Sequence, residues 1–162
     1  MEEIQFFSIG VYGCTSDDFF NKLTNSRIDL FVDIRSRRAV RGSKYAFVNS
    51  KRLQNQLKSI GINYLHVIEL APTKEIRDIQ KKADAESNVK KRERDRLGMN
   101  FIELYKKVIL DNFNIKSFTE LLQKSQARNV VLFCVEQNHQ ACHRSIVTEE
   151  IESKTGLRSI HL

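Results

Sequence analysis

The segment CVEQNHQACHRS, from Cys134 to Ser145, concentrates side chains that can do chemistry. Two thiols, two imidazoles, a carboxylate and a guanidinium fall within twelve residues. Such a set is compatible with a metal site, with a nucleophile beside an anion-binding loop, or with an ordinary turn between a strand and a helix. Each alternative makes a different demand on the spacing of the residues.

Cys142 is the candidate nucleophile of this segment. It directly precedes a predicted helix, and the free N–H groups and dipole at a helix N-terminus stabilise a thiolate. His143 and Arg144, which follow it, favour the thiolate in the same way. The alternative is structural, because free cysteines are common as small buried residues.

His143, Arg144 and the loop before them form a candidate anion-binding group. Backbone N–H groups at the start of a helix bind anions, and a guanidinium holds a phosphate or carboxylate with two hydrogen bonds. Glu136 is a candidate acid or base at the same place. Alternatively, Arg144 forms a salt bridge inside the protein, with a carboxylate such as Glu136 or Asp33.

We expect no metal in this segment. Cys134, His139, Cys142 and His143 are all possible zinc ligands, but the chain has no Cys-x-x-Cys pair here. Adjacent residues such as Cys142 and His143 are also poorly placed to share one ion. The spacing therefore argues against a zinc site.

A second motif, Asp33 and Arg35, ends another apolar run. Side chains two residues apart in a strand point to the same face. A carboxylate beside a guanidinium stays ionised, so it could act as a general base or hold a ribose hydroxyl. The alternative is a self-contained salt bridge between the two residues.

The stretch from Arg35 to Arg52 carries seven basic residues and no acidic one, and the whole chain has a formal charge of +7. A stretch of one sign favours anionic partners such as phosphate, a nucleotide or nucleic acid. The candidate anion contacts within it are Arg37, Arg38 and Arg41. The alternative is a solvated basic loop.

Apolar runs predict the elements that position these groups. Strands are expected over 4–10, 29–35, 62–68, 129–136 and 157–162. Helices are expected over 15–23, 49–61, 101–113, 117–123 and 143–156, two of them with a capping box, Thr15 with Asp18 and Ser117 with Glu120. The polar stretch at about 72–98 is an insertion, which we interpret as a solvated connector or an exposed, ion-paired helix.

The alternation of strands and helices predicts an α/β fold in one domain, residues 1–162. We expect a mostly parallel sheet of about five strands, with helices on both faces and a helical, charged insertion before the fourth main strand. Ligands of such sheets bind beyond the carboxyl ends of the strands. Asp33, Arg35, Glu136 and Arg144 should therefore meet around one cavity.

Length and composition limit the class of protein. A chain of 162 residues suits one domain with a real core. No apolar run is long enough to span a bilayer, and the first ten residues lack the pattern of a signal peptide. Three cysteines make a poor disulfide framework. We expect a cytoplasmic protein that does not enter membranes.

The motifs and their order resemble domain-of-unknown-function family 488. SIGVYGCTSDDFFNKL looks like the opening strand, turn and helix of that family, and LFVDIRSRRAVRG like its second strand with the D-x-R and basic loop. GINYLHVIEL resembles its third strand, and FCVEQNHQACHRSIV its Cys-x-Glu and Cys-His-Arg motifs. The resemblance implies an α/β domain and one shared site, made of Asp33, Arg35, Cys134, Glu136, Cys142, His143 and Arg144.

The chain departs from the family pattern in two places. After Ile9 the family often has Gly-His-Ser, whereas this chain has GVYGC, so the role of that histidine is lost or has moved toward Cys14. After the third strand the family often has Leu-Gly-Gly, whereas this chain has LAPT, which puts a close backbone approach to a ligand there in doubt.

Two functions are compatible with these patterns. The first is an enzyme on a phosphate-bearing or nucleotide-like anion, with Cys142 as nucleophile or with Asp33 or Glu136 as the acid or base. The second is a non-catalytic nucleic-acid-binding module that uses the basic stretch and nearby aromatic residues. A purely structural interaction protein would require the strand-end cavity to be filled by its own side chains. The sequence identifies no cofactor and leaves the reaction, the oligomeric state and the order of the insertion open.

Overall fold

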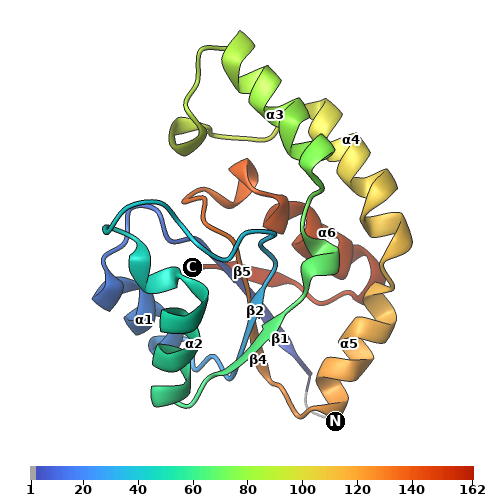
Figure 1. The fold of residues 1–162 in the computed structure, drawn as a ribbon. Coiled ribbons are helices and arrows are strands. Elements are labelled where there is room, and N and C mark those ends of the chain that lie inside the picture. The colour runs from blue at the N-terminus through green and yellow to red at the C-terminus, as the bar shows by residue number, and fades with distance from the viewer. Residues whose placement is uncertain (1–2) are drawn as a thin grey trace.

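In the computed structural model, which describes residues 3–162, five parallel strands form one central sheet (Figure 1). They are β1 (Gln5–Ile9), β2 (Leu30–Asp33), β3 (Asn63–His66), β4 (Asn129–Phe133) and β5 (Ser159–His161). Their order across the sheet is β3-β2-β4-β1-β5, and every pairing is parallel. The predicted α/β fold with a mostly parallel sheet is confirmed.

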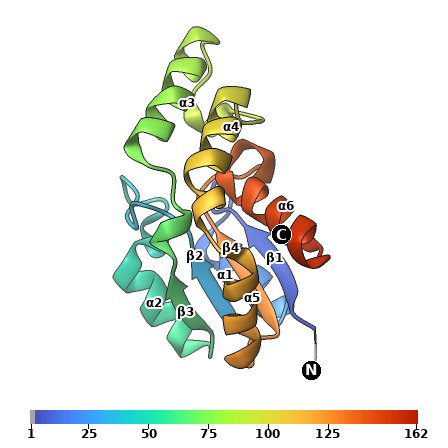
Figure 2. The same cartoon turned by 90° about the vertical axis from the view of Figure 1, so that its right-hand side faces the viewer.

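Helices cover both faces of this sheet. In Figure 1, α1 (Ser16–Asn25) and α2 (Ser50–Ser59) lie to the left of the sheet. The helices α4 (Met99–Val108), α5 (Ile115–Lys124) and α6 (His143–Thr155) lie to its right and face the viewer in Figure 2. No helix within residues 3–162 combines the length and the apolar character needed to cross a membrane.

The core is built around β1 and β4, two of the three inner strands of the sheet. Residues Phe6–Ile9 of β1 and Val130–Phe133 of β4 are all buried, as expected for strands with cover on both faces. On one face, the Phe19 ring of α1 lies 6.2 Å from the Phe31 ring of β2 and 5.6 Å from the Phe133 ring of β4. This aromatic cluster holds α1 against the strands whose ends carry the candidate site.

Capping side chains set where the helices begin. The predicted box at α1 is confirmed: the backbone N–H of Asp18 donates to Thr15 Oγ1 at 3.1 Å, and the N–H of Thr15 to the Asp18 carboxylate at 3.4 Å. The predicted box at Ser117 is wrong. Asn114 caps α5 instead, because its Oδ1 accepts the N–H of Ser117 at 2.9 Å, so the helix starts at Ile115.

The insertion is structured and lies above the carboxyl ends of the strands (Figures 1 and 2). It contains α3 (Lys74–Glu86), which packs against α4, and a 3-10 turn at Lys91–Glu93. Asp78 pairs with Lys74 at 3.5 Å and with Lys81 at 3.6 Å on the exposed side of α3. Of the two interpretations above, the structure has the exposed, ion-paired helix.

The strand order places a topological switch point at the carboxyl edge of the sheet. The chain leaves β1 and β2 toward the face covered by α1 and α2, whereas it leaves β4 toward α6 on the opposite face (Figure 1). Because β4 lies between β1 and β2, the loop after β4 turns to one face of the sheet while the loops after β1 and β2 turn to the other. Ligands of open α/β sheets bind at such switch points.

Candidate functional site

The loops after β1 and β4 cross closely at this edge. The backbone N–H groups of Val11 and Tyr12 both donate to the Val135 carbonyl at 3.1 Å. A Cβ atom on Gly10 would lie 1.9 Å from the Glu136 carbonyl oxygen, so only glycine fits there. This contact places the Glu136 backbone directly over the end of β1.

Asp33 and Arg35 meet at the end of β2, as predicted, and form a closed pair. Arg35 Nε donates to Asp33 Oδ1 at 2.9 Å, and Arg35 Nη2 to Asp33 Oδ2 at 2.7 Å. Arg35 also donates to the Val48 carbonyl at 3.0 Å, and the hydroxyl of Tyr64 donates to Asp33 Oδ2 at 2.8 Å. Burial and the adjacent Asp33 carboxylate raise the pKa of Tyr64 to about 12. This geometry matches the salt-bridge alternative for the motif.

Arg144 is almost fully buried, with 1% of its surface exposed, and it holds backbone rather than a carboxylate. Its Nη1 donates to the Glu136 carbonyl at 2.6 Å and its Nη2 to the Gln137 carbonyl at 3.1 Å. The expected tether therefore exists, but its acceptors are main-chain oxygens. Among residues 3–162, Arg144 Nε and Arg35 Nη1 are buried N–H groups without a hydrogen-bond partner.

Three possible ligand atoms gather where β4 ends and α6 begins. Cys134, Cys142 and His143 each contribute one atom, and these atoms all lie within 4.8 Å of one another. Cys142 Sγ is 3.7 Å from His143 Nδ1, and His143 Nε2 is 3.0 Å from the Ile34 carbonyl oxygen. The argument from spacing, that Cys142 and His143 cannot approach one ion, does not hold for this geometry.

The two thiols of this cluster differ in ionisation. Burial acts to raise the pKa of Cys142, but a hydrogen bond from Cys134 and the nearby His143 and Arg144 outweigh it and hold that pKa well below its ordinary value. The hydrogen bond with Cys142, together with burial, raises the pKa of Cys134 well above its ordinary value. These opposite shifts favour ionisation of Cys142 before Cys134.

Glu136 is a buried carboxylate facing the cations of the insertion. Only 4% of its surface is exposed, and burial raises its pKa above the ordinary value. Its Oε1 lies 3.5 Å from Lys91 Nζ and 3.8 Å from Arg94 Nη2. Both distances exceed the roughly 2.7–2.9 Å of a charge-assisted hydrogen bond. Glu136 therefore makes only loose ion pairs with these two cations.

The part of the insertion that follows its 3-10 turn contacts the segment just before Cys142. Arg94 donates to the Ala141 carbonyl at 2.9 Å and pairs with Asp84 of α3 at 2.7 Å. The backbone N–H of Leu97 donates to the Gln140 carbonyl at 3.0 Å. Cys142, which is 2% exposed, lies directly after these residues. Nothing in the polar composition of this stretch indicates that it reaches the Cys-His-Arg motif.

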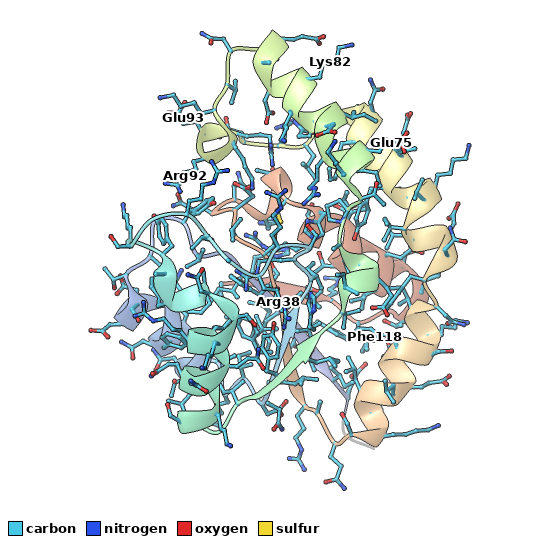
Figure 3. The ribbon with its side chains drawn as sticks, viewed as in Figure 1. Arg38, Glu75, Lys82, Arg92, Glu93 and Phe118 are labelled. Atoms are coloured by element: carbon cyan, nitrogen blue, oxygen red, sulfur yellow. The ribbon has the colours of Figure 1, made fainter. Side chains whose placement is uncertain are left out.

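Two tyrosine rings, from the loops after β1 and β2, contact the insertion through Arg92. The rings of Tyr12 and Tyr45 are 5.1 Å apart, and the guanidinium of Arg92 lies 4.6 Å from the Tyr12 ring and 5.6 Å from the Tyr45 ring. In Figure 3, Arg92 extends from the insertion toward the loop that follows β2. Of that loop, Arg37 and Arg41 are exposed, whereas Arg38 is half-buried beside Tyr64.

Three residues outside the predicted site, Ser8, His161 and Tyr105, make further contacts. Ser8 Oγ, in the middle of β1, lies 2.6 Å from Nδ1 of His161 in β5, and the His161 ring stacks on His139 at 3.6 Å. Tyr105 of α4, whose hydroxyl donates to the Leu70 carbonyl, lies beside His143 with ring centroids 5.7 Å apart. Only the strand order places Ser8 and His161 together, so no local pattern could have indicated them.

A comparison with family models matches residues 15–151 to the domain of unknown function DUF488. The chain belongs to the DUF488 family. Comparison with the curated proteins and with the solved structures found no match.

The DUF488 match includes the residues that meet at the carboxyl edge of the sheet. Asp33, Glu136, Cys142 and Arg144 all fall inside the matched range, and so does the insertion. Ser8 and His161 fall outside it. The matched range thus includes Cys134, Cys142 and His143 but excludes both residues of the Ser8–His161 contact.

Proposed function

We propose that this DUF488 protein is an enzyme that binds a phosphate-bearing or nucleotide-like anion at the carboxyl edge of its sheet and acts on it through Cys142. The observation that carries the proposal is the position of Cys142. Cys142 occupies the N-cap position of α6, and its Sγ lies 3.7 Å from His143 Nδ1. It directly follows Ala141, whose carbonyl accepts a hydrogen bond from Arg94 of the insertion. A thiolate at a helix N-terminus beside basic groups is the arrangement of a reactive cysteine.

Three sets of groups support anion binding. Lys91 and Arg94 have only loose contacts with Glu136, so an anion could replace that carboxylate as their partner. Arg35 Nη1 and Arg144 Nε are buried donors that the protein itself leaves without an acceptor within residues 3–162. Arg37 and Arg41, exposed on the neighbouring loop, would draw anions toward this edge.

Cys142 and Glu136 divide the chemistry of the proposed reaction. The thiolate attacks the electrophilic atom of the substrate, so a bond to sulfur forms while the bond to the leaving oxygen breaks. Once the bound anion has replaced Glu136 as the partner of Lys91 and Arg94, burial favours the protonated acid, which gives its proton to that oxygen. Water then displaces the sulfur, which returns Cys142 to its thiolate and Glu136 to its protonated form. Asp33 is not assigned to this chemistry, because its oxygens are engaged by Arg35 and Tyr64.

The test measures anion binding and thiol reactivity together. Inorganic phosphate and a nucleoside monophosphate are titrated calorimetrically into metal-free protein, into K91Q, and into the matched control K90Q, which changes an exposed lysine one residue away. We expect weaker binding for K91Q alone, and slower iodoacetamide labelling of Cys142 when the anion is bound. Equal binding by parent and K91Q, or no labelling of Cys142 at any pH, would contradict the proposal.

The second candidate function is nucleic-acid binding, and the exposed cations after β2 favour it. Arg37, Arg41 and Lys44 are all exposed there, and the Tyr12–Tyr45 pair lies beside them. Binding through such cations should weaken steeply as salt rises. The triple variant R37A/R38A/R41A should then lose affinity and reduce the salt dependence for single- and double-stranded nucleic acid. If the variant binds as the parent does, this candidate fails.

The setting of the proposed enzyme is the cytoplasm. The three cysteines, Cys14, Cys134 and Cys142, are all free thiols. Free thiols persist in reducing compartments, whereas secreted proteins of this size tend to pair them. A thiolate nucleophile also needs such a compartment in order to stay reduced.

A further inference from the structure

The carboxyl edge holds a set of donor atoms suited to a soft divalent cation. Two sulfur atoms and one imidazole nitrogen, from Cys134, Cys142 and His143, lie within 4.8 Å of one another. All three side chains are buried. Cys134 follows β4 and the other two open α6, so two rigid elements fix the donors in place.

The hydrogen bond of His143 orients its ring for this purpose. Nε2 lies 3.0 Å from the Ile34 carbonyl, which can only accept a hydrogen bond, so Nε2 carries a proton. In the metal-free protein Nδ1, which lies 3.7 Å from Cys142 Sγ, can donate a hydrogen bond to the thiolate; a metal ion would replace that proton and take the Nδ1 lone pair. Histidine ligands of metals are held in this way, by donation of the other ring N–H to a carbonyl or carboxylate.

The distances agree with tetrahedral coordination. With Zn–S near 2.3 Å and Zn–N near 2.0–2.1 Å, a sulfur and a nitrogen on one zinc ion are about 3.6 Å apart. The observed separation of Cys142 Sγ and His143 Nδ1 is 3.7 Å. A zinc ion would therefore require little movement of these two atoms and a modest approach by Cys134.

We propose that Cys134, Cys142 and His143 form a binding site for zinc or a similar soft divalent cation, with one coordination position left open. Two thiolates and a neutral imidazole are ligands that zinc prefers, and three protein ligands with an open fourth position differ from the closed, four-ligand set of a structural zinc site. Zn²⁺ with two thiolates is electrically neutral. A neutral centre avoids the cost of placing a net charge among these buried side chains.

This inference goes beyond the proposed function, because it concerns a second state of the same thiol. When a cation is bound, the sulfur of Cys142 is a ligand and cannot attack a substrate. Binding also requires the Cys134 thiol to release its proton to solvent. The metal-free protein would therefore be the form with a reactive thiol, and the loaded protein the form in which that thiol is protected.

The first arm of the test titrates Co²⁺ and Zn²⁺ into chelator-treated protein, with Co²⁺ as the spectroscopic probe for sulfur ligation. The parent and C14S should each bind one ion and show sulfur-to-cobalt charge-transfer absorption. C134S and H143Q should bind at least about tenfold more weakly. Circular dichroism confirms which variants fold. Equal affinity in C134S and the parent, or loss of binding in C14S, would overturn the inference.

The second arm needs no variant. Metal-free and Zn²⁺-loaded parent protein are treated with iodoacetamide, and the labelled peptides are quantified by mass spectrometry. Zn²⁺ should protect Cys134 and Cys142 and leave the labelling of Cys14 unchanged. No protection would overturn the metal site. Protection combined with an ordinary thiol pKa for Cys142 in the metal-free protein would instead keep the metal site and remove the proposed nucleophile.

Discussion

The Nη1 group of Arg144 donates to the backbone carbonyl of Glu136 at 2.6 Å, and the same carbonyl lies where a Cβ of Gly10 would have to be. The guanidinium thus joins the start of α6 to the loop after β4, and that loop rests on the end of β1. Hydrogen bonds from the buried guanidinium of Arg144 and between the two backbones thus hold the loops after β1 and β4 to the start of α6. Cys134 and Glu136 lie in the loop that Arg144 holds, and Cys142 lies at the start of α6, so this junction sets where all three side chains lie.

The G10A substitution should destabilise the protein. A Cβ placed 1.9 Å from the Glu136 carbonyl forces the two loops apart, and we expect the free energy of unfolding to fall by about 1–3 kcal/mol. Urea denaturation measures this. The control is G98A, whose new Cβ would be no closer than 3.5 Å to another atom outside its chain neighbours. A G10A variant as stable as G98A would show that the close crossing of the loops is absent.

Substitutions of Arg144 separate its geometry from its charge. R144K keeps the positive charge but loses the forked contact with two carbonyls, so the free energy of unfolding should fall by about 1–3 kcal/mol. R144Q also removes the charge that helps to lower the pKa of Cys142. The pKa of Cys142 should therefore rise in R144Q and change little in R144K. A pKa that moves equally in both variants would contradict the electrostatic role.

Stability should depend on pH through His161. Partial burial of its ring, then the neighbouring His139 and Arg144, lower the pKa of His161 to about 4 from an ordinary 6.5. A histidine with a lowered folded-state pKa stabilises the fold above pH 6.5, and that contribution is lost as the pH falls toward 4. After allowance for solvent screening of this exposed residue, the loss should be about 1–2 kcal/mol.

The control for this pH effect is H161Q, which removes the titrating group but can still hydrogen-bond Ser8. Urea denaturation at several pH values between 7 and 4 should show a flatter dependence for H161Q than for the parent. Identical curves would mean that the stacked histidine pair does not control acid stability. The measurement also tests the contact between β1 and β5, which lies outside the range matched to DUF488.

The sequence predicted the local parts of the fold well. Unbroken apolar runs identified β1, β2 and β4, and the alternation with helices identified the parallel sheet. The pairing of Asp33 with Arg35 also followed from the sequence, because residues two apart in a strand share a face. These features depend on neighbours along the chain, and such patterns are visible in one sequence.

Features that depend on distant contacts could not be predicted. The insertion is polar throughout, and nothing in its composition indicates that Arg94 reaches the Ala141 carbonyl or that Lys91 faces Glu136. The approach of Cys134 to Cys142 depends on how the loop after β4 folds back before α6. The strand order, which sets β4 between β1 and β2, likewise depends on tertiary packing rather than on local pattern.

The central claim is that Cys142 is a thiolate at neutral pH, and the most direct measurement is the ultraviolet thiolate absorbance of metal-free protein against pH. This readout needs no reagent to reach the buried sulfur. The account predicts a titration step well below the ordinary cysteine pKa of about 8.5, present in the parent and in C14S and absent in C142S. A parent protein whose thiols all titrate at or above about 8.5 would contradict it.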